Sequence, residues 1–230
     1  MKKIVVLTGA GVSAESGLST FRDAGGLWEG YDVMEVASPE GWARNRELVL
    51  KFYNERRSQL RTAQPNAAHL AIASLETKYD VTVITQNVDD LHERAGSTNV
   101  VHLHGELVKA RSSLDDNLVY DIGYEEIKTG DKCSKGSQLR PHIVWFGEMV
   151  PMIETAAEIC EEAELFIVVG TSLVVYLAAS LVEYTPAFIP KYIIDPVTPD
   201  MLYSPDNTIF IEEKAGTGMP KLAEELLSKN

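Results

Sequence analysis

The chain has 230 residues, 45% of them hydrophobic and 24% charged, which is the composition of an ordinary folded domain. Lys and Arg total 21 against 34 Asp and Glu, so the net charge is −13. This balance argues against a protein that binds nucleic acid or an anionic membrane through a basic surface. The two cysteines, Cys133 and Cys160, exclude a disulfide framework and a zinc site made of four cysteines.

The N-terminal sequence has two lysines and then an apolar run, residues 4–7, that is too short for a secretory signal peptide. No stretch approaches the roughly 20 apolar residues that a membrane span needs. Two thiols fit a reducing compartment. We therefore expect a cytoplasmic protein that binds neither nucleic acid nor membranes.

Short runs rich in Val, Ile and Leu predict buried parallel strands in five places. In chain order they are residues 3–8, 80–85, 165–169, 191–195 and 208–212. Helical patterns lie between most of them, at residues 65–77, 154–163 and 219–228. The alternation predicts an α/β fold with a Rossmann-like, doubly wound parallel sheet.

Two segments interrupt this alternation. Residues 18–64 are long, polar and largely helical in pattern, and residues 105–150 are rich in loop-forming residues. We predict that they form a small inserted lobe beside the sheet. The expected organisation is one catalytic domain, 1–230, with a Rossmann-like part at about 1–20, 65–104 and 150–230 and a small lobe at about 21–64 and 105–149.

Small and polar residues follow the predicted strands, where a parallel sheet forms its ligand crevice. Gly9-Ala10-Gly11-Val12-Ser13-Ala14 follows the first strand and fits the glycine pattern of a dinucleotide site, with a plain strand-to-helix turn as the alternative. A hydride-transfer enzyme would need a second strand ending in an acid about 20 residues later. The sequence there, residues 19–28, is no strand, so a conventional dehydrogenase is disfavoured.

Five histidines are present, and His69, His92 and His142 are interpreted as structural or surface residues. His104 follows an apolar run and precedes a glycine, which suits a base at the wall of a crevice. His102 lies two residues before it and shares its face on an extended segment, so a metal-binding pair is a rival interpretation.

Seven motifs occur in the order and approximate spacing found in sirtuins, the NAD-dependent protein deacylases, and they span essentially the whole chain. They are residues 9–17 (GAGVSAESG), 21–23 (FRD), 85–89 (TQNVD), 104–106 (HGE), 139–141 (LRP), 146–148 (FGE) and 170–172 (GTS). The chain resembles the bacterial members. The resemblance implies cleavage of the nicotinamide-ribose bond of NAD and transfer of an acyl group from lysine, giving free lysine, nicotinamide and O-acyl-ADP-ribose.

By resemblance, His104 is the general base and Asn87 its catalytic partner at the ribose. The residues expected to bind NAD are Gly9, Ala10, Gly11, Ser13, Ala14, Glu15, Phe21, Arg22, Trp28, Gln86, Asn87, Asp89, Gly170, Thr171, Ser172, Asp195 and Ala215. Asp89 is expected at the nicotinamide amide and Asp195 at the adenosine ribose, although the family often has Asn at the latter position.

The partner implied is an acyl-lysine protein or peptide. Residues 144–148 read as a short apolar strand, and the resemblance implies that it pairs with the substrate through Val144, Phe146, Gly147 and Glu148. A buried strand is the alternative.

A second pattern indicates which acyl group is removed from the substrate lysine. Tyr53 and Arg56 share a face of a helical stretch that could simply be solvated, but they resemble the Tyr-x-x-Arg signature of sirtuins that accept succinyl and malonyl lysine. Ala24 is the small residue that the same class uses to leave room for a longer acyl chain. The predicted activity is therefore desuccinylation and demalonylation, with deacetylation as an addition.

The chain departs from the sirtuin pattern at the residues that bind a structural metal ion. Most sirtuins bind a structural zinc ion with two Cys-x-x-Cys pairs, but here Ser112 stands at the first position and Cys133 is the one thiol of the second pair. We expect NAD as the cofactor, no zinc, and a lobe held by packing of Leu114, Leu118, Tyr120, Ile122 and Tyr124. A mono-ADP-ribosyltransferase and a non-catalytic NAD-binding module are the rival functions.

Overall fold

The computed structural model describes residues 1–18, 27–28, 30–171, 176–197 and 207–229. Its centre is a six-stranded parallel sheet with the strand order β11-β10-β9-β1-β4-β5. The strands are β1 (Lys3–Thr8), β4 (Asp80–Thr85), β5 (Val100–His102), β9 (Leu165–Val169), β10 (Lys191–Ile194) and β11 (Thr208–Ile211). The prediction of a doubly wound parallel sheet is confirmed, and β5, with three residues, is the strand that the sequence patterns did not predict.

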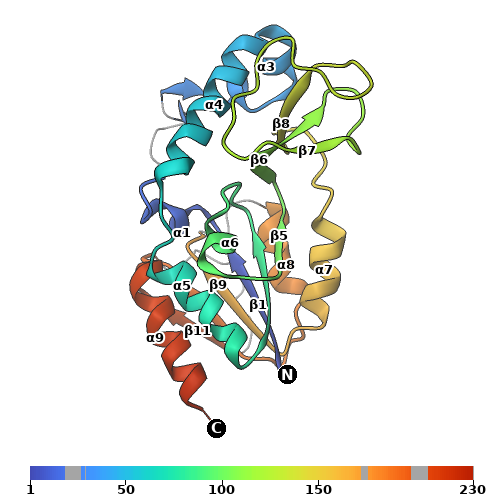
Figure 1. Cartoon of the computed structure of the whole chain (residues 1–230). Helices are drawn as coiled ribbons and strands as arrows, with labels where there is room; N and C mark the ends of the chain where they lie inside the picture. Colours follow the sequence, from blue (N-terminus) through green and yellow to red (C-terminus); the bar gives the residue numbers. More distant parts are fainter. Residues whose placement is uncertain (19–26, 29, 172–175, 198–206, 230) are drawn as a thin grey trace.

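Alternate residues of β1 pack into two separate cores, one on each face of the sheet. Ile4 and Val6 contact the cluster that includes α5 (Ala67–Ser74) and α9 (Ala215–Ser228). Val5 and Leu7 belong to the cluster formed with α7 (Ile153–Glu161) and α8 (Tyr176–Tyr184). Figure 1 shows these two helix layers around the sheet. Burial on both faces explains why the strands read as continuous apolar runs.

The short helices α1 (Ala10–Ala14) and α6 (Leu91–Ala95) follow β1 and β4, and a 3-10 turn, Leu75–Thr77, extends α5. Helix α9 begins at Ala215, four residues before the predicted start. Gly216 and Gly218 lie in this first part, and glycine weakens a helical pattern. Among the described residues, we find no helix with both the length and the apolar character needed to cross a membrane.

A second lobe lies at one end of the sheet (Figure 1). It contains the hairpin of β2 (Leu27–Trp28) and β3 (Tyr31–Asp32), then α2 (Val33–Val36), α3 (Pro39–Arg44) and α4 (Arg46–Thr62). Its other half is an antiparallel sheet of order β7-β6-β8, made of β6 (Gly105–Ser112), β7 (Val119–Asp121) and β8 (Leu139–Ile143). A core of its own, which includes Phe52, Leu107 and Trp145, joins the two halves.

The predicted strand at residues 144–148 is wrong, because β8 ends at Ile143 and a turn follows. Trp145 is buried in the core of the lobe, and the Trp145 backbone N–H donates to the carboxylate of Glu148 at 2.8 Å. Gly147 has a φ of +89°, which bends the chain away from an extended path.

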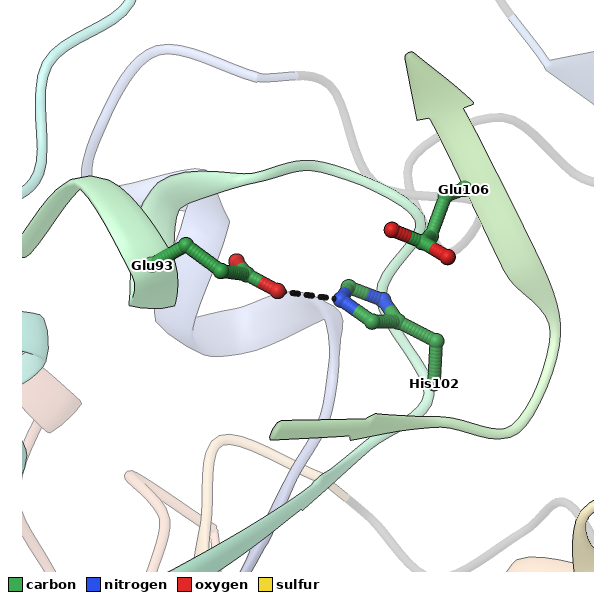
Figure 2. A group of neighbouring side chains, drawn as sticks. All are labelled: Glu93, His102 and Glu106. Carbon is green, nitrogen blue, oxygen red and sulfur yellow. Dashed lines mark hydrogen bonds and ion pairs between the residues drawn. The ribbon is translucent and has the colours of Figure 1, made fainter. Parts of the chain in front are cut away.

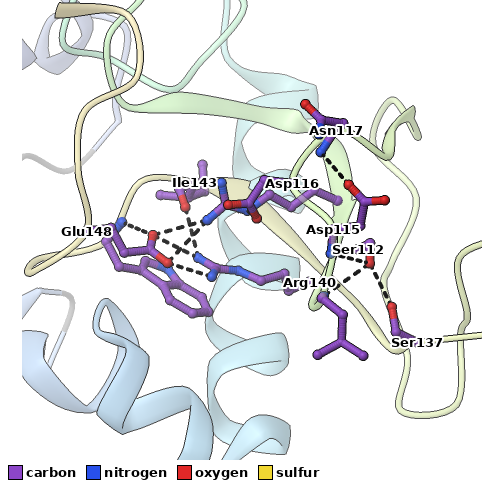
Figure 3. Close-up of polar contacts among 11 residues, drawn as sticks. Ser112, Asp115, Asp116, Asn117, Ser137, Arg140, Ile143 and Glu148 are labelled. Carbon is purple, nitrogen blue, oxygen red and sulfur yellow. Dashed lines mark hydrogen bonds and ion pairs between the residues drawn. The ribbon is translucent and has the colours of Figure 1, made fainter.

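The packing expected to hold the lobe is partly wrong. Leu114 is 87% exposed and contributes no burial, whereas Ile122 and Tyr124 pack against the lobe core. Hydrogen bonds hold the segment around Leu114 instead. The Ser112 hydroxyl accepts from the backbone N–H groups of Leu114 and Asp115, both at 3.1 Å, and lies 2.7 Å from the hydroxyl of Ser137 (Figure 3).

The same cluster does not suit a structural zinc ion. Cys133 Sγ lies 3.0 Å from Ser137 Oγ, so the group that contains Ser112 offers one thiol and two hydroxyls. Structural zinc sites use thiolates and imidazoles, and a serine hydroxyl is not among their usual ligands. The residues present therefore do not fit this metal, and its place in the lobe is taken by hydrogen bonds.

Metal analysis of the purified protein should accordingly find no stoichiometric zinc, and a chelator should leave the melting temperature and activity unchanged. A protein whose structural zinc ion is bound by four cysteines, treated in parallel, is the control and should release its metal and unfold. One zinc ion per chain that is released only on unfolding would contradict the prediction.

Candidate active site

The crevice forms where β1 and β9 lie side by side, because the chain leaves these strands toward opposite edges of the sheet. The glycines of two predicted motifs meet there. The backbone N–H of Gly9 donates to the Val169 carbonyl at 3.1 Å, and that of Gly11 donates to the Gly170 carbonyl at 2.8 Å. A Cβ atom on Gly11 would lie 2.8 Å from the Gly170 oxygen, so only glycine permits this approach.

Gly170→Ala should lower the free energy of unfolding by about 1–3 kcal/mol, because Gly170 has a φ of +63° that strains other residues. A Cβ atom there would also lie 2.5 Å from the backbone nitrogen of Val12. Gly17→Ala is the matched control, since Gly17 has a φ of +83° and open space around it. Denaturant unfolding of both variants checks the prediction: Gly170→Ala should lose more stability than Gly17→Ala because of the contact with Val12, and equal losses would show that the contact with α1 is unimportant.

Polar side chains after β4 form a buried network against the glycine turn. The amide of Asn87 donates to the Gly9 carbonyl at 3.0 Å and to the Ser13 hydroxyl at 2.9 Å. Ser13 in turn donates to the Asp89 carboxylate at 2.7 Å. Burial raises the pKa of Asp89 above its ordinary value, although the bond from Ser13 opposes this shift. The structure thus brings four predicted site residues together.

His104 lies just beyond β5, and its ring is partly buried. Nδ1 donates to the carbonyl of Gln86 at 2.9 Å, so Nε2 of the neutral ring is left as the proton acceptor. Burial lowers the pKa of His104, which keeps the ring neutral near pH 7. A neutral imidazole with a fixed tautomer is the form that a general base needs.

His102 and His104 do not form the metal-binding pair that was the rival interpretation, because the ring of His102 contacts other groups. Its Nδ1 lies 3.0 Å from the next carbonyl oxygen, that of Asn87, and its Nε2 lies 2.7 Å from Glu93 Oε1. His69 and His92 are fully buried and have structural bonds, to the backbone of Asn66 and the hydroxyl of Thr8. Burial lowers the pKa of His69 to about 4 and that of His92 well below its usual value.

Other described residues that are predicted to bind a nucleotide lie near the same crevice. Gln86 donates to Thr171 Oγ1 at 3.2 Å, which joins the ends of β4 and β9. Glu15, just after Ala14 at the end of α1, accepts from the Gly216 N–H at 2.9 Å, beside the buried Ala215 at the start of α9. Asp195 follows β10, is 5% exposed, and accepts from the Val197 N–H at 3.1 Å.

Ala10 begins α1. Trp28 lies in β2 of the small lobe, with its ring 5.1 Å from that of Phe52. Four other predicted site residues, Phe21, Arg22, Ala24 and Ser172, lie outside the described residues.

Tyr53 and Arg56 lie on the buried face of α4, so the alternative of a solvated face is wrong for this pair. Tyr53 is 0% exposed and its hydroxyl accepts from the indole N–H of Trp145 at 3.0 Å. Arg56 is 8% exposed, with its guanidinium 4.9 Å from the centre of the Phe52 ring. Burial raises the pKa of Tyr53, so the phenol stays protonated and can donate its O–H.

The predicted substrate segment runs beside the base. The backbone N–H of Val144 donates to the His104 carbonyl at 2.9 Å, and that of Phe146 donates to Ala37 at 3.0 Å. Phe146 is 49% exposed. The Glu148 carboxylate accepts from Arg140 at 2.7 Å and from Arg111 at 3.2 Å, so it is occupied within the protein (Figure 3).

Sequence reasoning missed the two arginines of this cluster and the partner of His102. Arg140 belongs to the motif at residues 139–141, which by itself indicates no role for it, and its guanidinium carbon lies 3.2 Å from the centre of the Trp145 ring. Glu93 lies nine residues before His102, and no local pattern links the two. Their pairing depends on α6 lying beside β5.

Comparisons with known proteins agree with this geometry. The Sir2 family profile matches residues 9–177. An "NAD-dependent protein deacylase" of Helicobacter pylori is 52% identical over 227 residues, covering 99% of this chain and 98% of the relative. A protein of the same name from Bacteroides thetaiotaomicron is 52% identical over 232 residues, covering 99% of each chain.

A solved structure described as a Sir2 homolog–NAD complex superposes with a TM-score of 0.86 at 43% identity, covering 98% of this chain and 90% of the other. A complex described as a Sir2 variant with deacetylated p53 peptide and 3′-O-acetyl ADP-ribose has a TM-score of 0.76 at 30% identity, covering 97% and 92%. The match of the family profile, the level of identity and the shared fold together show that this chain belongs to the Sir2 family.

Proposed function

We propose that the chain is an NAD-dependent protein-lysine deacylase that transfers the acyl group from lysine to ADP-ribose. The observation that carries the proposal is the position of His104, a partly buried neutral base whose Nδ1 is held by the Gln86 carbonyl next to the Asn87 network. The names of the bacterial relatives and the NAD complex among the similar structures support it. We also propose a cytoplasmic location and a single catalytic domain, 1–230.

The glycines of the crevice suit the pyrophosphate of NAD. Gly9, Gly11 and Gly170 bring backbone close together at the carboxyl ends of β1 and β9, as a pyrophosphate site requires. Asp195, which follows β10, would accept hydrogen bonds from the hydroxyl groups of a ribose, and Ala215 at the start of α9 would contact the adenine. Bound NAD supplies an activated ribose carbon that accepts the acyl oxygen.

The residues of this chain then have separate tasks. His104 Nε2 accepts a proton from a ribose hydroxyl, while its Nδ1 bond to Gln86 fixes the ring. Asn87 holds the ribose side of the pocket, and its bonds to Gly9 and Ser13 fix its amide. Asp89 binds the nicotinamide amide from a buried position. The net charge of −13 suits lysine-rich protein substrates.

We further propose that succinyl and malonyl lysine are the preferred substrates, with acetyl lysine also accepted. The Tyr53 hydroxyl and the Arg56 guanidinium are three residues apart on one face of α4 and are both buried. A carboxylate at the end of an acyl chain would accept charge-assisted hydrogen bonds from this pair. The peptide backbone would lie along Val144 and Phe146, with Glu148 holding their turn through Arg140.

Nicotinamide release, measured with and without acyl peptide, tests the proposal. A deacylase releases nicotinamide in step with loss of the acyl group, and only when the peptide is present. Release with a mass gain on an acceptor protein would indicate ADP-ribosyl transfer instead. NAD binding without any release would indicate a module that only binds the nucleotide.

A further inference from the structure

The proposed base, His104, and a second histidine, His102, hold two consecutive backbone carbonyls. His104 donates to the carbonyl of Gln86 at 2.9 Å, and His102 donates to that of Asn87 at 3.0 Å. The Asn87 side chain is also fixed, by Gly9 and Ser13. The backbone carbonyl of Asn87 is therefore held by His102, a residue to which the proposed mechanism gives no task.

Both nitrogens of His102 face hydrogen-bond acceptors. The Asn87 carbonyl lies at Nδ1, and Glu93 Oε1 lies 2.7 Å from Nε2 (Figure 2). A carbonyl and an ionised carboxylate can only accept, and a neutral imidazole has a single N–H. The two bonds are satisfied together only when the ring carries both protons, as an imidazolium.

A metal ion is the other explanation for this group. The ligand atoms of Glu93, His102 and Glu106 all lie within 4.8 Å of one another. Yet the 2.7 Å from Nε2 to Glu93 is a direct hydrogen bond, whereas ligand atoms around a zinc ion with bonds of about 2.1 Å lie about 3.4 Å apart. Glu106 already has a cationic partner, Lys109, at 2.7 Å. Charge within the group is thus balanced without a metal.

We propose that His102 is a positioning residue whose imidazolium holds Asn87 in place, and that Glu93 maintains the charge on the ring. When the ring loses a proton, its one remaining N–H has two acceptors, and the carboxylate is the stronger of them. The Asn87 carbonyl then loses its donor. The inference rests on the proposed function, because it predicts a decline of deacylation at alkaline pH that is separate from the ionisation of His104.

The charges around His102 support this assignment. Burial by itself lowers the pKa of His102, but the hydrogen bond and charge of Glu93, with the charge of Glu106, raise the pKa above its ordinary value. The titratable groups around the ring are Glu93 and His92 from α6, Asp89 before it, Glu106 and Lys109 from β6, and His142 from β8. His92 is uncharged, because burial lowers its pKa well below neutrality, and Lys109 pairs with Glu106.

Three substitutions separate the two bonds of the ring. The amide nitrogen of Asn takes the place of Nδ1, so His102→Asn retains the bond to the Asn87 carbonyl. This variant should keep most of the turnover of the wild type. The amide of Gln takes the place of Nε2, so His102→Gln retains only the bond to Glu93, and its kcat should fall about fivefold. Glu93→Gln can donate to Nε2, which leaves Nδ1–H of a neutral ring on Asn87.

The experiment measures kcat between pH 6 and 10 at saturating NAD and succinyl peptide. The wild type should decline at alkaline pH by about fivefold, and both Glu93→Gln and His102→Asn should lack that decline. KM for NAD and peptide should change less than kcat, and thermal melts should show that each variant is folded. An identical alkaline decline in wild type and Glu93→Gln would overturn the proposal.

A second readout does not depend on turnover. NMR titration of the His102 ring in the full chain should give a pKa above about 6.5 in the wild type and a lower one in Glu93→Gln. A wild-type value at or below that of a free histidine would refute the imidazolium even if deacylation is confirmed. Zn²⁺ alone should show no binding that requires His102, and stoichiometric binding that His102→Asn abolishes would assign the group to a metal instead.

Discussion

Replacing His104 by Tyr should abolish deacylation of succinyl, malonyl and acetyl peptides alike, with kcat falling by about 10²–10⁴-fold. The imidazole is the one group in the described part of the crevice that combines a neutral ring, a fixed tautomer and a free Nε2 acceptor. A phenol has no such acceptor with a suitable pKa. Steady-state assays with each peptide check the prediction.

The control is that the variant still folds and binds NAD, which thermal melts and a binding titration report. Since burial lowers the pKa of His104, the base remains available below the ordinary value of about 6.5. Activity should therefore fall on the acid side only as the ring becomes protonated below that pH. Turnover retained by His104→Tyr would show that another residue takes the proton.

The sheet could be predicted because its strands are buried on both faces. In β1, for instance, Ile4 and Val6 face one core while Val5 and Leu7 face the other, so these four consecutive positions are apolar and the run is conspicuous. The small antiparallel sheet gives no such run. Strand β6 is irregular between Glu106 and Ala110, and β8 contains Pro141, which breaks the usual strand pattern.

For the candidate site, too, some features could be predicted from the sequence and others could not. Residues that follow strands, such as Asn87 and His104, could be located because the ends of parallel strands meet at one edge. The contacts that give these residues their properties arise from tertiary packing. The bond from Trp145 to Tyr53 joins residues 92 positions apart, and the pair of His102 with Glu93 requires that α6 lies beside β5. No local spacing contains that information.

Arg56→Met should raise KM for a succinyl peptide by about ten- to a hundredfold and leave the KM for an acetyl peptide within about twofold, because a charge-assisted hydrogen bond contributes about 1.5–3 kcal/mol. An acetyl group has no carboxylate, so it forms no such bond with Arg56 and its KM should not depend on that residue. Methionine keeps much of the volume of the side chain against the Phe52 ring, so the helix packing is largely retained. Parallel kinetics with peptides that differ only in the acyl group check the prediction.

The neighbouring arginine of the same helix is the matched control. Arg57 is 0% exposed and donates to the Glu125 carbonyl at 3.0 Å, so its guanidinium supports the lobe. Arg57→Met leaves that carbonyl without its donor, and it should lower the free energy of unfolding by about 1–3 kcal/mol. Any kinetic loss in Arg57→Met should be equal for the two peptides. If Arg56→Met also affects the two peptides equally, Arg56 stabilises α4 and does not bind the acyl carboxylate.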